Sequence, residues 1–132
     1  MKKNGFSLNE LVVAMGIIGI LAAIAIPAYS AYTKTANRTD AIRSMTYDAQ
    51  ALERCYSQSF TYMGCASAVS GPSAQGYYTI AIAPTANSFT ITATPLKSPQ
   101  TSDSMCTSFT VDNTGAQSAT PAANSQTCWG ST

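Results

Sequence analysis

The feature that most constrains this chain is an almost wholly apolar run from Leu11 to Ile26. No charged residue occurs from Leu11 to Thr33, yet Glu10 stands directly before the run. With the residues up to Tyr29, the run reaches the ~20 residues that a helix needs to cross a bilayer. Its length and uniformity argue against a buried helix of a soluble domain, which leaves a removed signal peptide or a retained membrane helix.

Glu10 separates these two interpretations. A secretory signal peptide would use Lys2 and Lys3 as its basic start and Ala23-Ile24-Ala25 as its cleavage site. An acid has no role between the basic start and the apolar core of such a peptide. A carboxylate that enters a membrane is costly and usually marks a function with a definite partner. The sequence therefore favours a retained helix.

Composition limits the remainder to one domain with little catalytic equipment. The 132 residues include seven Lys+Arg, six Asp+Glu and no histidine, so the commonest general base and metal ligand are missing. No Ser or Cys stands in a recognisable catalytic arrangement. We therefore expect no enzyme activity, no cofactor and no metal, and we find no basic patch that would favour nucleic acid.

Four cysteines, Cys55, Cys65, Cys106 and Cys128, all follow the apolar run. Their even number, together with the absence of histidine and of close C-x-x-C pairs, favours disulfide bonds over a zinc site. Disulfide bonds persist in oxidising compartments, so this part of the chain is expected outside the cytoplasm. Four cysteines allow three pairings.

The residues beyond Pro27 predict an amphipathic continuation of the helix. Apolar residues recur at spacings of three and four, in a stripe that we interpret as a face covered by a sheet: Ala41, Ile42, Met45, Ala49, Leu52 and Tyr56. The charged residues lie largely off this stripe: Lys34, Arg38, Asp40, Arg43, Asp48, Glu53 and Arg54. One helix from about Ser7 to about Ser57 follows, about 75 Å long at ~1.5 Å per residue.

The rest of the chain predicts a small β-rich head. Residues 59–76 indicate a loop packed on the helix, and strands are expected at 76–83, 88–94 and 106–111, with a short fourth one near 116–119. Turns are expected at 84–87 and 112–115. Short connections between strands predict an antiparallel meander over the helix, which is an α+β fold.

The stretch GFSLNEL, Gly5 to Leu11, resembles the class III signal of type IV pilins and pseudopilins, whose usual form is close to G-F-T-L-I-E-L. The likeness runs from Lys2 to about Tyr32 and includes GIIGILAAIAIPAY. Asn9 departs from the pattern, since the family more often has an apolar residue there. The resemblance implies the pilin fold, with an apolar first half of the helix, an amphipathic second half and a small antiparallel sheet.

The resemblance also implies how the N-terminus is processed and used. Prepilin peptidase would cleave between Gly5 and Phe6, and the new Phe6 amine would be N-methylated. Glu10 lies one helical turn further on and would pair with that amine, because either charge alone is penalised in a low dielectric. This pair would set the register in which subunits dock. The alternative is an acid that merely favours a helix N-terminus.

Three segments and a helix break follow from the same likeness. Residues 1–5 would be the leader, 6–32 the membrane and filament-core helix, and 33–132 the head. Gly16, Gly19 and Pro27 weaken the helix, and Pro27 removes a backbone hydrogen bond. We expect a break in this region, which would open during assembly.

The favoured disulfide pairing is Cys55–Cys65 with Cys106–Cys128. Both pairs are local in the sequence, and the second resembles the C-terminal disulfide loop of many pilins. The crossed pairings stay open at this point.

The expected function is that of a type IVa major-pilin-like subunit. It would polymerise with itself and other pilins into a helical surface filament, through the pilus assembly machinery, after residing in the inner membrane. Such a fibre serves adhesion, twitching motility or DNA uptake. Without Lys2 and Lys3 the side-chain charge is five minus six, or −1, so charge does not support nucleic-acid binding.

Three alternatives remain. The chain is a minor pilin, a type II secretion pseudopilin, or a membrane-anchored extracytoplasmic enzyme or binding protein. Only Asp103 and Asp112 are present for the calcium site that major pseudopilins carry in their C-terminal loops, which disfavours the second alternative.

Overall fold

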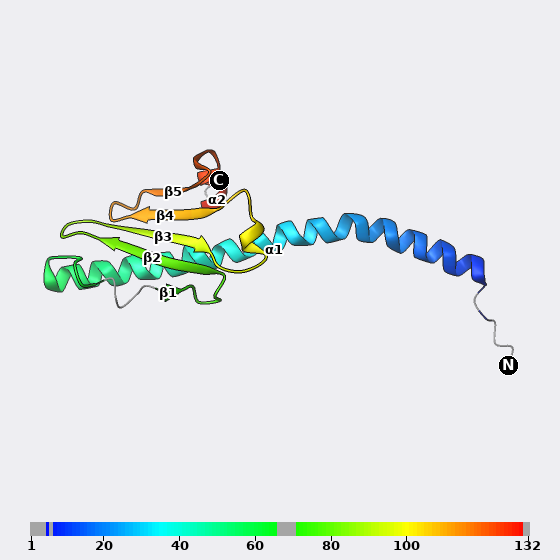
Figure 1. Ribbon diagram of the computed structural model, residues 1–132, viewed down its shortest axis with the longest axis horizontal. Coiled ribbons are helices and arrows are strands. Elements are labelled where there is room, and N and C mark those ends of the chain that lie inside the picture. The colour runs from blue at the N-terminus through cyan, green and yellow to red at the C-terminus, as the bar shows by residue number, and fades with distance from the viewer. Residues whose placement is uncertain (1–4, 6, 66–70, 131–132) are drawn as a thin grey trace. The chain divides into compact units, whose positions relative to one another are not determined.

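The computed structural model describes residues 5, 7–65 and 71–130. Outside the described residues lie most of the predicted leader (1–4), the predicted new N-terminus Phe6, and part of the predicted loop (66–70). The chain divides into two compact units, Met1–Thr33 and Lys34–Thr132. Helix α1 (Leu8–Ser59) contributes to both (Figure 1).

The bounds of α1 lie within two residues of the predicted helix. The predicted break is not present: α1 continues through Gly16, Gly19 and Pro27 without interruption. Proline withholds a single amide hydrogen, and each glycine costs only about 1 kcal/mol relative to alanine. The hydrogen bonds of the turns on either side therefore suffice to keep the helical path. Opening of this region during assembly stays a prediction.

The second unit contains a five-stranded antiparallel sheet with the strand order β1-β2-β3-β4-β5 (Figure 1). The strands are β1 (Gly71–Pro72), β2 (Tyr78–Pro84), β3 (Phe89–Pro95), β4 (Ser108–Asp112) and β5 (Gln117–Thr120). The predicted meander and the α+β class are confirmed. β1 was not predicted, because two residues, one of them proline, carry no alternating pattern.

Three short helices were also not predicted. They are η2 (Gln100–Ser102), η3 (Ala122–Asn124) and α2 (Ser125–Trp129). Each is too short to show the period of a helix in the sequence. α2 ends at Gly130, whose φ of +73° is a left-handed conformation that glycine adopts easily.

The core of the second unit lies between α1 and the sheet. Met45 and Leu52 of α1 are fully buried beside Tyr78, Ile91 and Phe109 of the sheet. The predicted apolar stripe is confirmed as the covered face: Ala41, Met45 and Leu52 are buried, and Ile42, Ala49 and Tyr56 are partly buried.

Two edge-to-face ring contacts extend the core to the C-terminal helix. The ring centroids of Tyr78 and Phe109 are 5.7 Å apart, and those of Phe109 and Trp129 are 5.8 Å apart. Trp129 also donates a hydrogen bond from Nε1 to the Ser118 carbonyl at 2.8 Å. The contacts and the hydrogen bond together hold α2 against the sheet.

The expectation that the charged residues of α1 lie off the covered face is wrong for Arg38, Asp40 and Asp48. All three are buried, with 7%, 4% and 7% of their surface exposed. Helical periodicity placed them at the margin of the apolar stripe. The segments that cover this margin, residues 73–75 and 100–103, were not identified as parts of the core.

Two disulfide bonds link the cysteines as Cys55–Cys65 and Cys106–Cys128. The first joins the last turns of α1 to the loop that follows. The second joins the residues before β4 to α2. This second bridge closes a loop of 22 residues, which the chain-entropy model values at about 3 kcal/mol of stability.

Candidate assembly segment and head surface

The first turn of α1 is closed by reciprocal hydrogen bonds between Ser7 and Glu10. The Ser7 amide and hydroxyl donate to Glu10 Oε2 at 2.9 and 2.8 Å, and the Glu10 amide donates to Ser7 Oγ at 3.3 Å. This is a capping box, in which two free amide groups at the helix start are satisfied. Phe6, the predicted partner of Glu10, lies outside the described residues, so the amine pair stays a prediction.

The sequence contains the signal for this cap, because Ser7-Leu8-Asn9-Glu10 has the S-x-x-E form. Sequence reasoning singled out Glu10 but missed Ser7. The acid therefore has a structural partner within its own turn, and any role in assembly comes in addition to that cap.

The apolar half of α1 exposes its side chains on all sides. Val13 is 54% exposed and Ile26 is 69% exposed, and the large apolar residues between them fall in the same range. By length and composition, α1 is able to cross a membrane. An exposed apolar surface of this extent needs a bilayer or neighbouring helices to cover it.

A buried ion pair fixes the segment that contains η2 to α1. Arg38 donates from Nε and Nη2 to the two carboxylate oxygens of Asp103, at 2.8 and 2.9 Å. Burial alone would raise the pKa of Asp103, but the hydrogen bonds and charge of Arg38 outweigh it and the pKa is lowered. Nearby, Gln100 donates from Nε2 to Tyr78 Oη at 2.6 Å and to the Lys34 carbonyl at 3.2 Å.

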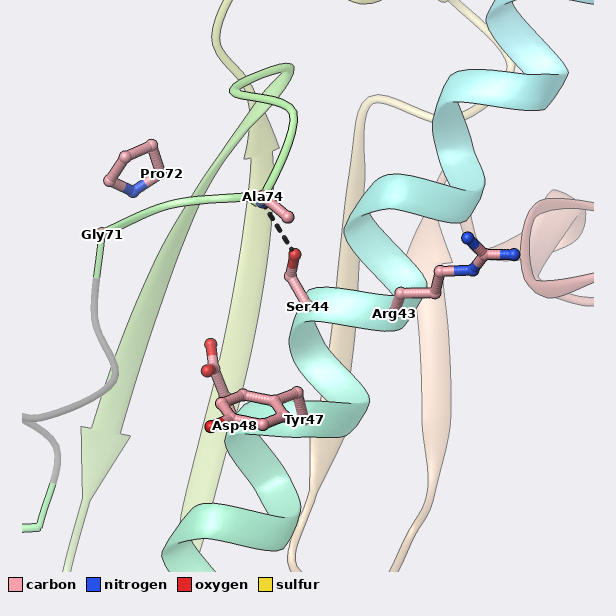
Figure 2. A pocket seen from close by; sticks show the side chains of 7 residues that line it. All are labelled: Arg43, Ser44, Tyr47, Asp48, Gly71, Pro72 and Ala74. Atoms are coloured by element: carbon pink, nitrogen blue, oxygen red, sulfur yellow. Dashed lines mark hydrogen bonds between the residues drawn. The ribbon is translucent and has the colours of Figure 1, made fainter.

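A second polar contact fixes residues 73–75 to α1. The Asp40 carboxylate accepts from Ser73 Oγ and, at 3.0 Å, from the Gln75 amide. The Ala74 amide donates to Ser44 Oγ at 3.2 Å, as the dashed line in Figure 2 shows. These bonds hold the chain before β2 at a set distance from the helix.

A pocket of about 480 Å³ opens between these two segments (Figure 2). Arg43, Ser44, Tyr47 and Asp48 line it from α1, and Gly71, Pro72 and Ala74 line it from the opposite side. Burial raises the pKa of Asp48 to about 6.

Burial divides the charges of the head unequally. Of its five acids, Asp40, Asp48 and Asp103 are buried, whereas Arg38 is the one buried cation among Lys34, Arg38, Arg43, Arg54 and Lys97. The accessible surface of the head therefore has four cations against two acids, Glu53 and Asp112. Sequence reasoning missed this excess because it counted all charges equally.

Two of these cations share one face of α1. Arg43, Tyr47, Gln50 and Arg54 follow one another at spacings of four, three and four, and all are exposed. Residues at these spacings lie along one stripe of a helix. Among the described residues, neither Arg43 nor Arg54 has a side-chain hydrogen bond or ion pair.

An apolar N-terminal helix whose second half carries a disulfide-bonded antiparallel sheet defines the class of the type IV pilins. Comparison with protein families agrees. Residues 1–26 match the prokaryotic N-terminal methylation motif, and residues 27–110 match the family described as "Type IV minor pilin ComP, DNA uptake sequence receptor". The second match covers more than half of the chain, so the chain belongs to this family of type IV pilins.

Similar curated proteins match over shorter stretches. "Prepilin peptidase-dependent protein D" of Escherichia coli (strain K12) is 46% identical over 54 residues, which are 41% of this chain and 37% of that protein. "Type IV major pilin protein PilE1" of Neisseria gonorrhoeae is 50% identical over 40 residues, 30% of this chain and 24% of that protein. A "Fimbrial protein" of Neisseria meningitidis serogroup B (strain ATCC BAA-335 / MC58) matches over the same shares. The chain thus spans well under half of these relatives.

Proposed function

We propose that this chain is a minor subunit of a type IV pilus and binds DNA at the pilus surface during uptake. The observation that carries the proposal is the match of residues 27–110 to a family described as a minor pilin and DNA uptake sequence receptor. Type IV pilins are structural proteins, and the proposed role is binding rather than catalysis. The expectation of a major subunit gives way to this more specific one.

Assembly would use the N-terminal segment. Prepilin peptidase would remove residues 1–5, Phe6 would be N-methylated, and the apolar half of α1 would rest in the inner membrane before it enters the filament core. The exposed apolar side chains of α1 support this path, because neighbouring pilin helices would replace the lipid around them. Adhesion and twitching motility would be properties of the whole filament.

DNA contact would use the accessible cations of the head. Phosphate neutralisation by Lys and Arg dominates the affinity of proteins for DNA. The buried acids still act at long range, but they cannot contact a phosphate, whereas Arg43 and Arg54 are both exposed on one face of α1. Their spacing of eleven residues corresponds to about 16 Å along the helix, which suits contact with phosphates on both sides of a groove.

The DNA-binding test uses the full mature chain in detergent micelles and a fluorescently labelled duplex, whose anisotropy is measured at several salt concentrations. For Arg43→Gln with Arg54→Gln, we expect weaker binding and a salt dependence reduced by about 0.9 per lost phosphate contact. Glu53→Gln is the matched control on the same helix and should not weaken binding. Unchanged affinity and salt dependence in the double variant would rule out this surface.

Subunit abundance separates a minor from a major pilin. Sheared filaments should contain the mature chain, starting at Phe6, in amounts far below those of another pilin. If the chain is the main component of the filaments, the minor-pilin proposal is wrong.

The role of Glu10 is tested by variants that separate its charge from its cap. Glu10→Gln keeps an oxygen that can accept from Ser7 but removes the charge, and Ser7→Ala removes the cap but keeps the charge. If Glu10 pairs with the Phe6 amine, Glu10→Gln and Glu10→Leu should be processed yet enter filaments poorly, while Ser7→Ala assembles. The reverse pattern would assign Glu10 to capping alone.

A further inference from the structure

Asp48 is the one acid that the fold leaves without a partner. All six acidic side chains of the chain lie within the described residues. Asp40 and Asp103 are bonded as described above, and Glu10 accepts from Ser7. Glu53 accepts from Tyr62 Oη, and Asp112 accepts from Thr114 and Ala116. Across residues 5, 7–65 and 71–130, Asp48 has no hydrogen bond and no ion pair.

This carboxylate is 93% buried, and it forms part of the wall of the 480 Å³ pocket between α1 and residues 71–74 (Figure 2). Arg43, the nearest cation on the same helix face, extends away from the pocket in Figure 2 and does not pair with it. A buried carboxylate without a partner destabilises a protein. Its presence in an open pocket indicates that the missing partner is a ligand.

The walls of the pocket restrict what this ligand is. Tyr47 offers an aromatic ring, and Pro72 and Ala74 offer aliphatic surface. Among the described residues, no group of three or more His, Cys, Asp or Glu side chains gathers to hold a metal ion. One carboxylate among apolar walls suits an organic cation with an apolar stem, since the stem covers the walls and the charge meets the acid.

The pocket is held open by bonds that do not involve Asp48. Asp40 binds Ser73 and Gln75, and Ser44 binds Ala74, so the two walls are joined above the acid. Removal of the Asp48 charge should therefore leave the pocket in place. A ligand would bind a preformed site.

We propose that this pocket binds a primary alkylammonium group, with Asp48 as the counter-ion and Tyr47 and Pro72 against the alkyl stem. The chemistry is that of a lysine side chain or of a free polyamine. Buried in the pocket, the ammonium group would donate charge-assisted hydrogen bonds to the carboxylate. The site is separate from the proposed DNA function, and its test contains no DNA.

The test uses the ¹⁵N-labelled full chain in detergent micelles, at a pH well above the pKa of Asp48. n-Butylammonium, which reproduces the lysine side chain, is titrated while amide resonances are recorded. We expect saturable shifts at Ser44, Asp48 and Ala74. n-Butanol, which has the same stem without the charge, should give shifts at least about tenfold weaker in affinity, because a hydrogen bond to a charged group contributes about 1.5–3 kcal/mol.

Two variants control the result. Asp48→Asn keeps the shape of the side chain, and n-butylammonium should lose at least about tenfold in affinity for it. Glu53→Gln removes an exposed acid from the same helix and should leave the affinity unchanged. The proposal is overturned if n-butylammonium gives no saturable shifts, if n-butanol binds equally well, or if Asp48→Asn binds like the unaltered chain.

A final comparison identifies the source of the ammonium group. Spermidine and a short peptide with a single central lysine are titrated against the same sample. Tighter binding of the peptide assigns the site to a lysine of a partner protein, and tighter binding of spermidine assigns it to free polyamines. If neither binds while n-butylammonium does, the pocket does not accept the group in either natural form and the proposal fails.

Discussion

The buried pair of Arg38 and Asp103 allows the sharpest test of how the head is held together. Their side chains are 8% and 3% exposed, and two hydrogen bonds of 2.8 and 2.9 Å join them across 65 residues of sequence. Arg38→Met removes the guanidinium but keeps a side chain of similar reach. The Asp103 carboxylate then remains buried without its counter-charge.

The expected loss of stability is about 3 kcal/mol, the lower end of the range for breaking a buried pair by removing one partner. The lower end applies because Asp103 also accepts a hydrogen bond from the Met105 amide at 3.2 Å, which the variant keeps. Adding Asp103→Leu removes the orphaned charge, so the double variant should recover to within about 1 kcal/mol of the unaltered chain.

The assay is urea unfolding of the full chain in mild detergent, followed by the fluorescence of Trp129, the single tryptophan. Because Arg38 lowers the pKa of Asp103 in the folded state, the stabilisation by the pair is complete above the pKa of an unfolded aspartate. It is lost as the pH falls through the lower folded-state value. The difference between the unaltered chain and Arg38→Met should therefore shrink in acid.

Two results would refute this reasoning. One is a loss below about 1 kcal/mol for Arg38→Met, which is the size expected of an exposed pair. The other is a double variant as unstable as the single one, which would show that packing rather than the unpaired charge causes the loss.

Three further predictions use the same unfolding assay. Tyr78→Phe removes the acceptor of the 2.6 Å bond from Gln100 and should cost about 1–2 kcal/mol, whereas no loss would mean that this bond is replaced. Replacing Cys106 and Cys128 together by Ser should cost about 3 kcal/mol, and a loss near zero would contradict the loop-closure argument. Burial raises the pKa of Asp48 from 3.8 to about 6, so the folded state holds a proton that the unfolded state releases, and stability should fall as the pH rises through this interval. Asp48→Asn should abolish that fall and gain about 1–3 kcal/mol above it, and an unchanged pH profile would show that the acid is well solvated.

Patterns that repeat along the chain were predictable. The spacing of Ala41, Met45 and Leu52 identified the covered face of α1, because a helix turns by a constant angle per residue. The alternation in residues 78–84 and 89–95, with turn residues between them, identified two strands and their antiparallel pairing. The capping box of Ser7 and Glu10 was equally open to prediction, since all of its atoms belong to one turn.

The amino-acid sequence by itself determined the apolar helix, the pilin class, and the α+β order of helix before sheet, since each depends on residues close together in the chain. The tertiary structure alone decided that Arg38 meets Asp103, that Asp40 is satisfied by Ser73, and that Asp48 is left alone beside a pocket. These contacts join residues 33 or more positions apart. Local spacing carries no information about them, because the path of the chain between the partners sets which charges are buried and which face solvent.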